Sequence, residues 1–543
     1  MHVWIDSIYV WPLYIKLMKY IFYLLTFFAS ITFPHHELFG QVVTLYNNDS
    51  SLMGTGIMQG GKMEGLWKFL DPSDKSLIQE GHYIEGKRNG RWTSYYPNGK
   101  PLVKAEYKNN SLNGPYREYD SKGMLILEST MQDSVLVGPF RMYYAAHETP
   151  DDRKTQLKTK GEFKDGEIYG TLISYFPNGQ IALRQNFVNG KLDGAYQEYE
   201  DTGDLILGTH YKNSLRHGSF KRMAGGMVEE EGEYDMGRRV GKWKKYFPFT
   251  RVLESETYYD NRGDRTGKWT YYYDNRRVAR VEQYEYDIPT GTWEEFYPNR
   301  NLAKRKTYEM GMPVGEYIEK DSKGNPSVTG QYVNGVRAGM WSNYFPDGEL
   351  YSLGEYKSDV KSGLWKFFNR IGILTAEGEF QLGSEHGQWF YYYDGGQLRS
   401  VGSYFFGLEE GVWGLFYDNK QLTQEETWSN GRLINVGEYY NYDGTRTLDK
   451  GTLQDSNGTR ITYYVNGRKE SEGYYASGRP EGVWKYYHDN GRLASEGQMV
   501  DGKKEGQWKY YNRNGRLDEV LIFENDEVVP VEIPEADLPF QRF

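Results

Sequence analysis

A Gly-x-aromatic step recurs along this chain at a nearly constant interval, and this period constrains the fold more than any other feature. After Gly315 the step returns at Gly339, Gly363 and Gly387, an interval of about 24 residues. Roughly nineteen copies follow one another if the degenerate copy at Gly437 is included. A fixed period of this length is typical of a repeat array in which each copy is one supersecondary unit.

Each copy contains two stretches that are separated by turn residues. The first stretch begins at the Gly-x-Trp step, as in GVWKYY at Gly482, and ends at an Asn-Gly or Asp-Gly pair such as Asn98-Gly99. A second stretch follows, such as RLASEGQMV, and ends at a further pair such as Asp501-Gly502. Such pairs tolerate the left-handed conformations that tight hairpin turns require. Each copy is therefore expected to be one β-hairpin.

The sequence thus predicts an all-β fold, an elongated, open-ended antiparallel meander of tandem β-hairpin repeats. Aromatic residues make up 16% of the chain and glycine occurs 63 times, which suits many turns and a core of aromatic side chains. A lone hairpin is marginally stable in water, but in an array each hairpin gains neighbours that stabilise it.

The two ends of the chain depart from the repeat pattern. Residues 41–64 are expected to form an N-terminal cap and a first partial repeat, and residues 65–523 the tandem repeats. Residues 524–543 are acidic and interrupted by proline, and they are expected to form a C-terminal cap or tail. A cap is needed because an open sheet edge favours aggregation.

The sequence of residues 1–40 indicates a secretory signal peptide. Lys19 precedes an apolar run from Tyr20 to Phe33, which is short for a bilayer span and is followed by polar residues. Met18 is a second candidate for the translation start, because it would place this basic residue at the N-terminus. The alternative is an uncleaved segment that anchors the chain in a membrane. Both hypotheses place the repeats outside the cytoplasm, in the periplasm, on the cell surface or in the medium.

The pattern NG-x-L, G-x-Y, NG-x-x-x-G-x-W and YY resembles the MORN repeat, and in particular its bacterial variant form. The resemblance covers roughly Gly54 to Phe523. It implies scaffolding, partner binding or membrane association rather than one particular reaction. The copies are not uniform, since several replace the tryptophan, at Tyr116, Phe140, Leu172, Tyr196, Phe220 and Tyr317.

The third residue after the tryptophan position is aromatic in nearly every copy. Strict alternation along a strand puts Trp484 and Tyr486 on one face, and Lys485 and Tyr487 on the other. Either both faces carry aromatic columns or a bulge bends each strand, and the sequence leaves this open. An exposed aromatic column would be a binding surface. The candidate residues for it are Tyr95, Tyr119, Tyr246, Tyr272, Phe296, Tyr344, Phe368, Tyr487 and Tyr511.

Motifs for catalysis, metals, cofactors and nucleic acids are missing from the sequence. The nine histidines show no metal-ligand spacing, there is no cysteine, and there is no Gly-x-Ser-x-Gly or phosphate-binding loop. The net charge of −10 comes with interspersed signs, without a basic stripe that would neutralise phosphates or anionic lipid. We therefore expect no enzyme activity, no cofactor, no nucleic-acid partner and no membrane association beyond the N-terminal segment.

Two functions fit these observations. The leading hypothesis is a non-enzymatic, exported scaffold whose extended β surface binds a protein partner or assembles larger structures. The alternative is binding to cell-wall polysaccharide or another glycan through rows of exposed tryptophan and tyrosine, because such rings stack on sugars. Loss of binding when the third-position tyrosines are replaced would fit both hypotheses, and the chemistry of the ligand would separate them.

Overall fold

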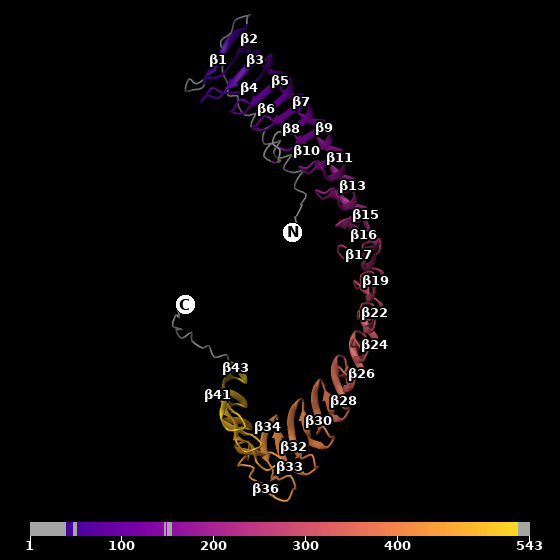
Figure 1. Cartoon of the computed structure of the whole chain (residues 1–543), viewed down its shortest axis with the longest axis vertical. Coiled ribbons are helices and arrows are strands. Elements are labelled where there is room, and N and C mark those ends of the chain that lie inside the picture. Colours follow the sequence, from indigo (N-terminus) through magenta and orange to yellow (C-terminus); the bar gives the residue numbers. More distant parts are fainter. Residues whose placement is uncertain (1–39, 47–51, 146–147, 149–154, 530–543) are drawn as a thin grey trace, which may run out of the picture. The chain divides into compact units, whose positions relative to one another are not determined.

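The computed structural model describes residues 40–46, 52–145, 148 and 155–529 (Figure 1). The predicted signal segment up to residue 39 and the tail from residue 530 lie outside the described residues. The chain divides into two compact units, one of residues 1–228 with 234–237 and one of residues 229–233 with 238–543. Each unit is described by itself.

Unit 1 is an antiparallel meander. Its strands pair in chain order from β1 to β15, and within the described residues β1 pairs only with β2. The strands are β1 (Gln41–Tyr46), β2 (Leu52–Gln59), β3 (Lys62–Leu70), β4 (Leu77–Ile84), β5 (Lys87–Tyr95), β6 (Pro101–Lys108), β7 (Ser111–Tyr119), β8 (Leu125–Gln132), β9 (Val135–Tyr143), β10 (Leu157–Lys164), β11 (Glu167–Tyr175), β12 (Ile181–Val188), β13 (Lys191–Tyr199), β14 (Leu205–Lys212) and β15 (Leu215–Ala224). Strand β16 (Met227–Asp235) is divided between the two units.

Unit 2 continues the same pattern and contains one interruption. Strands β17 to β34 pair in chain order, except that β20 pairs both with the two-residue strand β21 and with β22. Strands β35 and β36 form a separate two-stranded sheet, and β37 to β43 form a seven-stranded meander. The strands up to the interruption are β17 (Arg238–Tyr246), β18 (Leu253–Tyr259), β19 (Gly267–Tyr272), β20 (Val278–Glu285), β21 (Ile288–Pro289), β22 (Gly291–Phe296), β23 (Leu302–Glu309), β24 (Met312–Lys320), β25 (Pro326–Val333), β26 (Val336–Tyr344), β27 (Leu350–Lys357), β28 (Val360–Phe368), β29 (Leu374–Gln381), β30 (Ser384–Tyr392), β31 (Leu398–Phe405), β32 (Leu408–Phe416), β33 (Leu422–Ser429) and β34 (Arg432–Val436). The others are β35 (Tyr439–Tyr440), β36 (Thr447–Leu448), β37 (Gly458–Tyr463), β38 (Lys469–Ala476), β39 (Arg479–Tyr487), β40 (Leu493–Val500), β41 (Lys503–Tyr511), β42 (Leu517–Glu524) and β43 (Glu527–Val529).

The predicted all-β meander of tandem hairpins is thus confirmed, and its sheets are open rather than closed into barrels. The described residues contain no helix, and so none that is long and apolar enough to cross a membrane. The degenerate copy at Gly437 falls at the interruption between β34 and β37, where strand pairing is weakest.

The Asn-Gly pairs close two different kinds of turn. At Asn189-Gly190 both residues are left-handed, with φ of 48° and 71°, as a two-residue hairpin loop requires. At Asn98-Gly99 only the glycine is left-handed, and the loop is longer. There the N–H of Gly99 donates to the carbonyl of Tyr96 at 2.9 Å, and the N–H of Tyr96 donates to the carbonyl of Lys100 at 2.8 Å. The two kinds alternate along most of the meander, one on each rim of the sheet; the turn at Gly225 and Gly226 and the loop between β18 and β19 are exceptions.

The first strand of each repeat begins earlier than the sequence predicted. Strand β5 begins at Lys87, three residues before Gly90, which has a φ of 70° inside the strand. The register with β4 passes from the pair Gly81 and Trp92 to the pair His82 and Asn89, so that Gly90 and its neighbour have no opposing residue on that strand. This is a bulge, and glycine permits it because it has no Cβ. The predicted strand start at the Gly-x-Trp step is therefore wrong by three residues.

Candidate functional site

The tryptophans form the core of the repeats and occupy one face of the sheet, here called the tryptophan face. Trp365 is 1% exposed, and its ring fills the space over Gly354 on the neighbouring strand. Its Nε1–H donates to the carbonyl of Glu355 at 3.1 Å. The same indole-to-carbonyl bond recurs at Trp67, Trp92, Trp243, Trp269, Trp293, Trp341, Trp389, Trp413, Trp484 and Trp508.

Side chains from the same strand cover this tryptophan row. Because the glycine bulge bends the strand, the residue four positions before the tryptophan reaches back over the ring. The Nζ of Lys361 lies 4.5 Å from the ring centroid of Trp365, and the guanidinium of Arg88 lies 4.5 Å from that of Trp92. Ten of the twelve tryptophans in the described residues are buried. The predicted rows of exposed tryptophan are therefore wrong, since these rings are core.

The nine predicted binding residues are all half-buried. The O–H of Tyr487 donates to Glu472, which pairs in register with Lys485, so that Tyr487 lies on the face opposite the tryptophans. We call this the outer face. The register also shifts between Tyr486 and Tyr487, and the same shift precedes each of the nine residues. Both possibilities left open by the sequence thus occur together, an aromatic column on each face and a bulge in each hairpin.

Several outer-face tyrosines are paired with a glutamate fifteen residues earlier in the chain. The O–H of Tyr95 donates to Glu80 at 2.6 Å, and burial together with this carboxylate raises the pKa of Tyr95 to about 12. Equivalent bonds join Tyr246 to Glu231, Tyr392 to Glu377, Tyr487 to Glu472 and Tyr511 to Glu496. These bonds hold the rings in place on the sheet.

Other side chains join each repeat to the next one. The O–H of Tyr393 donates to the carbonyl of Phe416 at 2.8 Å, and the side-chain amide of Asn490 donates to the carbonyl of Arg513 at 2.8 Å. The tyrosine bond recurs at Tyr96, Tyr144, Tyr273, Tyr297, Tyr417 and Tyr464, and the amide bond at Asn98, Asn178, Asn299, Asn419 and Asn466. Consecutive hairpins are therefore fixed by side chains as well as by backbone pairing.

Large apolar side chains are exposed on the outer face of β26, β28 and β32, which with β30 are the first strands of four consecutive repeats; Figure 1 labels all four strands. Met340, Leu364 and Val412 are 54%, 50% and 61% exposed there. Beside them lie the half-buried aromatic rings of Tyr344, Phe368, Tyr392 and Phe416. We call these seven residues the outer patch. The patch contains two of the nine predicted residues, Tyr344 and Phe368.

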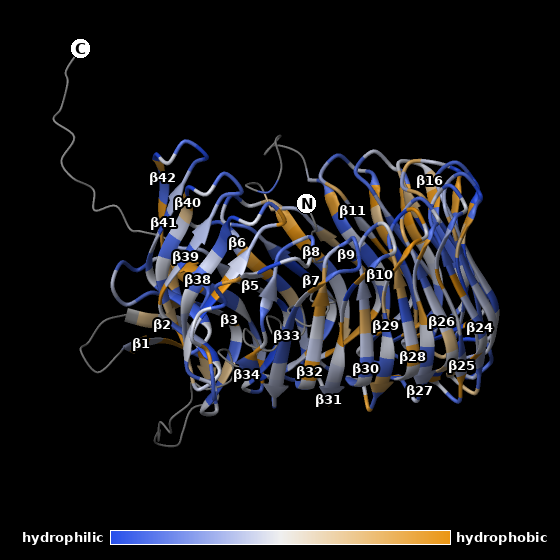
Figure 2. Ribbon diagram, turned by 90° about the horizontal axis from the view of Figure 1, so that it is seen from below, coloured by the Kyte–Doolittle hydropathy of each residue, from blue (hydrophilic) through white to orange (hydrophobic). Residues whose placement is uncertain are grey.

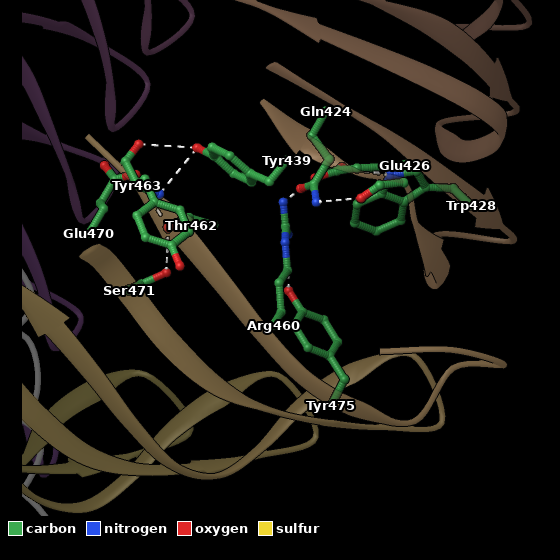
Figure 3. A network of polar contacts seen from close by, with 11 residues as sticks. Gln424, Glu426, Trp428, Tyr439, Arg460, Thr462, Tyr463, Glu470, Ser471 and Tyr475 are labelled. Atoms are coloured by element: carbon green, nitrogen blue, oxygen red, sulfur yellow. Dashed lines mark hydrogen bonds and ion pairs between the residues drawn. The ribbon is translucent and has the colours of Figure 1, made fainter. Parts of the chain in front are cut away.

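A buried ion pair lies at the interruption between β34 and β37 (Figure 3). Arg460 binds Glu426, and their side chains are 16% and 7% exposed. Glu426 also accepts a bond from the Nε1–H of Trp428 at 3.0 Å, and Arg460 donates to the O–H of Tyr475 at 3.4 Å. Burial alone would lower the pKa of Arg460, but the carboxylate of Glu426 holds it above its usual value.

This ion pair replaces the usual core contact of a repeat. Arg460 follows Gly458 by two residues and so occupies the tryptophan position of its repeat, while Glu426 occupies the position that is Gly354 or Gly402 in other repeats. Sequence reasoning did not identify either residue. Arg460 could have been found by aligning the repeats, because this copy has an arginine where other copies have the tryptophan of the Gly-x-Trp step.

Among the residues that the structure describes, no cluster of three or more His, Cys, Asp or Glu side chains is arranged to hold a metal ion. The hydrophobic and hydrophilic residues instead alternate along the strands (Figure 2). The outer face thus presents aromatic rings, carboxylates and ammonium groups that recur at the regular spacing of the strands.

The family model described as MORN repeat variant matches four stretches, residues 88–109, 168–189, 385–405 and 480–501. Each stretch spans one hairpin, from the start of a Gly-x-Trp strand to the end of the strand that follows it. No curated protein matches this chain significantly.

Solved structures give only weak likenesses. The Tc holotoxin pore of Photorhabdus luminescens is 12% identical, with a TM-score of 0.14, over 88% of this chain and 27% of that chain. A crystal structure of TcdB2-TccC3-Cdc42 is 9% identical, with a TM-score of 0.12, over 89% of this chain and 30% of that chain. This chain thus spans less than a third of their length, and TM-scores this low carry no argument about fold or function.

Proposed function

Because this chain carries MORN repeat variants, we propose that it is a non-enzymatic, exported scaffold that binds a protein partner on the outer face of its sheet. Export is inferred from the N-terminal sequence alone. The binding role is inferred from the repeats and from the outer patch.

The outer patch is the observation that supports this proposal. Large apolar side chains that are half exposed on the first strands of successive repeats are unfavourable in water, and such patches mark interaction sites. The first strands are two strand spacings apart, so the patch presents an apolar group about every 10 Å. Elsewhere on the outer face the equivalent positions are mixed, charged at Lys242 and Glu316 and apolar at Leu66 and Val483. The patch is distinguished by large apolar residues at this position in three of four consecutive repeats.

The ladder of side-chain bonds between repeats favours tight binding on such a surface. Tyr393 holds the backbone of Phe416, and Tyr392 is held by Glu377, so that two rings of the patch are connected to an ordered network. A surface that is ordered before binding loses less conformational entropy when the partner binds.

The test is capture of a partner from an envelope extract by the purified chain, before and after glycan-degrading treatment. We expect a protein that survives the treatment and that is lost from a variant with Met340→Ser, Leu364→Ser and Val412→Ser. The matched control carries Ile371→Ser and Val465→Ser, which are 75% and 56% exposed but lie in the turns. Capture that is unchanged by the patch substitutions would refute the proposal.

The same experiment tests glycan binding. Since ten of the twelve described tryptophans are buried, the outer-face tyrosines with their glutamates, such as Tyr487 with Glu472, are the candidates to stack on a sugar and accept its hydroxyl hydrogen bonds. Binding that disappears after glycan degradation, and in a Tyr487→Ser and Tyr511→Ser variant, would favour this alternative.

A further inference from the structure

The two-residue turns that lead from the second strand of one repeat to the first strand of the next have an unusual feature. The first turn residue has a φ near +50° in every case, and most repeats use asparagine, aspartate or serine there. Such residues tolerate the left-handed region because their short polar side chains can bond locally. They are Asn109, Asp133, Asp165, Asn189, Asn213, Asn334, Ser358, Asn430, Asp455, Ser477, Asp501 and Asn525.

Four turns of unit 2 have large apolar residues at this position instead. Tyr286, Met310, Leu382 and Phe406 have φ values of 51°, 47°, 51° and 50°. They are 56%, 86%, 80% and 42% exposed. A bulky side chain is strained in this region, and an exposed apolar side chain is unfavourable in water. Neither is needed to form the turn, because Asn334 forms it between two of them.

Strain and apolar exposure at the same positions indicate a surface that is covered in the functional state. All these turns lie on one rim, because the meander places every second turn on the same side. Six consecutive turns form what we call the turn row, with first residues Tyr286, Met310, Asn334, Ser358, Leu382 and Phe406. Apolar residues beside them add to it, namely Ile288, Met312, Val333, Val360, Phe405 and Leu408, all 39% to 54% exposed.

The pattern of apolar and polar turns in the turn row is the same from either end. Two apolar turns, two polar turns and two apolar turns follow one another. A twofold axis between the turns of Asn334 and Ser358 would place Met310 opposite Leu382, and Tyr286 opposite Phe406. A surface that matches itself under a twofold axis is what a symmetric dimer requires.

We propose that the turn row is the interface of a homodimer in which two copies of this chain pack rim to rim in antiparallel order. The twelve apolar and turn residues together expose on the order of 1,000 Å² per copy, compared with about 800 Å² per partner in a standard interface. The area is thus sufficient for a stable dimer.

Charges in the turn row favour the antiparallel order over the parallel one. Glu285 and Glu309 flank the first two turns, whereas the Leu382 turn is uncharged and the Phe406 turn has the carboxylate of Glu385 beside Gly407. In the antiparallel order Glu309 faces the uncharged turn of Leu382. In the parallel order Glu309 would face Glu309 of the second copy, and like charges across an interface are destabilising. The charged central turn is neutralised within the chain, since Asp359 binds Arg337 at 3.0 Å.

This inference does not depend on the proposed function, because the turn row and the outer patch are different surfaces with different residues. The dimer is measured without any partner, so failure of one proposal leaves the other intact.

The first test is the molar mass of the purified full chain by light scattering and sedimentation at micromolar concentrations. We expect a dimer, and at least a tenfold weaker dimer in a variant with Met310→Asn, Leu382→Asn and Phe406→Asn. Asparagine is the residue of the neighbouring turns, so these substitutions relieve strain and the variant should remain folded. The control is Ile371→Asn on the opposite rim, which should leave the dimer unchanged. A monomeric unsubstituted chain, or a dimer that the triple variant retains, would refute the proposal.

The second test fixes the orientation and uses the absence of cysteine from the chain. A variant with both Met310→Cys and Leu382→Cys should form disulfide-linked dimers under mild oxidation. Each single variant should not, because the antiparallel order separates the two copies of Met310 by about 30 Å. Cross-linking of the Met310→Cys variant with itself would contradict the antiparallel order.

Discussion

The indole ring of Trp365 occupies the space that a side chain on Gly354 would fill. The same relationship joins Gly56 to Trp67, Gly81 to Trp92, Gly232 to Trp243, Gly330 to Trp341, Gly378 to Trp389, Gly402 to Trp413, Gly473 to Trp484 and Gly497 to Trp508. Where the ring is smaller, the opposing residue has a side chain, as with Ala105 beside Tyr116 and Thr209 beside Phe220. The two strands of neighbouring repeats thus match in volume, which is why the glycine recurs together with the tryptophan.

This match predicts the effect of Gly354→Ala. The added methyl would overlap the ring of Trp365, so either the ring or the strand must move, and we expect destabilisation by about 1–3 kcal/mol. Denaturant unfolding followed by tryptophan fluorescence measures it. Gly208→Ala is the control, because a Cβ there would meet only ordinary contacts, the nearest at 3.6 Å from Leu205. Equal effects of the two substitutions would contradict the volume argument.

The buried ion pair predicts an effect on the strands that follow it. Arg460→Met leaves the carboxylate of Glu426 buried without its partner, and we expect a loss of about 3–5 kcal/mol. Adding Glu426→Gln removes that charge but keeps an acceptor for Trp428, so the double variant should lose less. Hydrogen exchange in β37 to β43 would report the change. A double variant that is less stable than Arg460→Met would show that charge burial is not the cause.

The bonds between repeats can be tested at Tyr393. Tyr393→Phe removes the hydrogen bond to the carbonyl of Phe416 and keeps the ring, so we expect a loss of about 0.5–1.5 kcal/mol. Thermal unfolding measures this loss. Tyr474→Phe is the control, since that tyrosine is 44% exposed. A loss as large in the control would mean that the effect is not specific to the bond between repeats.

The outer-face tyrosines predict how stability depends on alkaline pH. Burial and a neighbouring glutamate raise the pKa of Tyr95, Tyr246 and Tyr392 from 10 to about 12. Between these values the folded state holds protons that the unfolded state has lost. The contribution of these three tyrosines to the stability of the folded state is therefore complete below pH 10 and is lost as the pH rises toward 12.

Phenolate absorbance and circular dichroism, recorded together, would measure this dependence. We expect the buried phenols to ionise together with unfolding between about pH 10 and 12. Glu80→Gln should allow Tyr95 to ionise at a lower pH, because it removes the neighbouring carboxylate. Ionisation of all tyrosines near pH 10 with the fold intact would contradict this prediction.

The sequence allowed much of the fold to be predicted and less of the site. The period of the Gly-x-Trp step and the Asn-Gly pairs led correctly to tandem hairpins, because both depend on local backbone geometry. The strand starts were misplaced because Gly90 bends the chain within a strand instead of beginning one. The exposed tryptophan rows of the glycan-binding alternative were wrong, because side chains such as Arg88 and Lys361 reach over the rings of Trp92 and Trp365.

The sequence by itself determined the repeat unit, the order of strands and the positions of the turns, since these follow from short-range patterns that recur throughout the chain. The tertiary structure decided which aromatic column is core and which faces solvent, because burial depends on how neighbouring repeats pack. It also showed that Arg460 and Glu426, far apart in sequence, replace a tryptophan and a glycine at the same point of the core. Finally, it showed that Met310 and Leu382 are exposed and have a left-handed backbone at their turns.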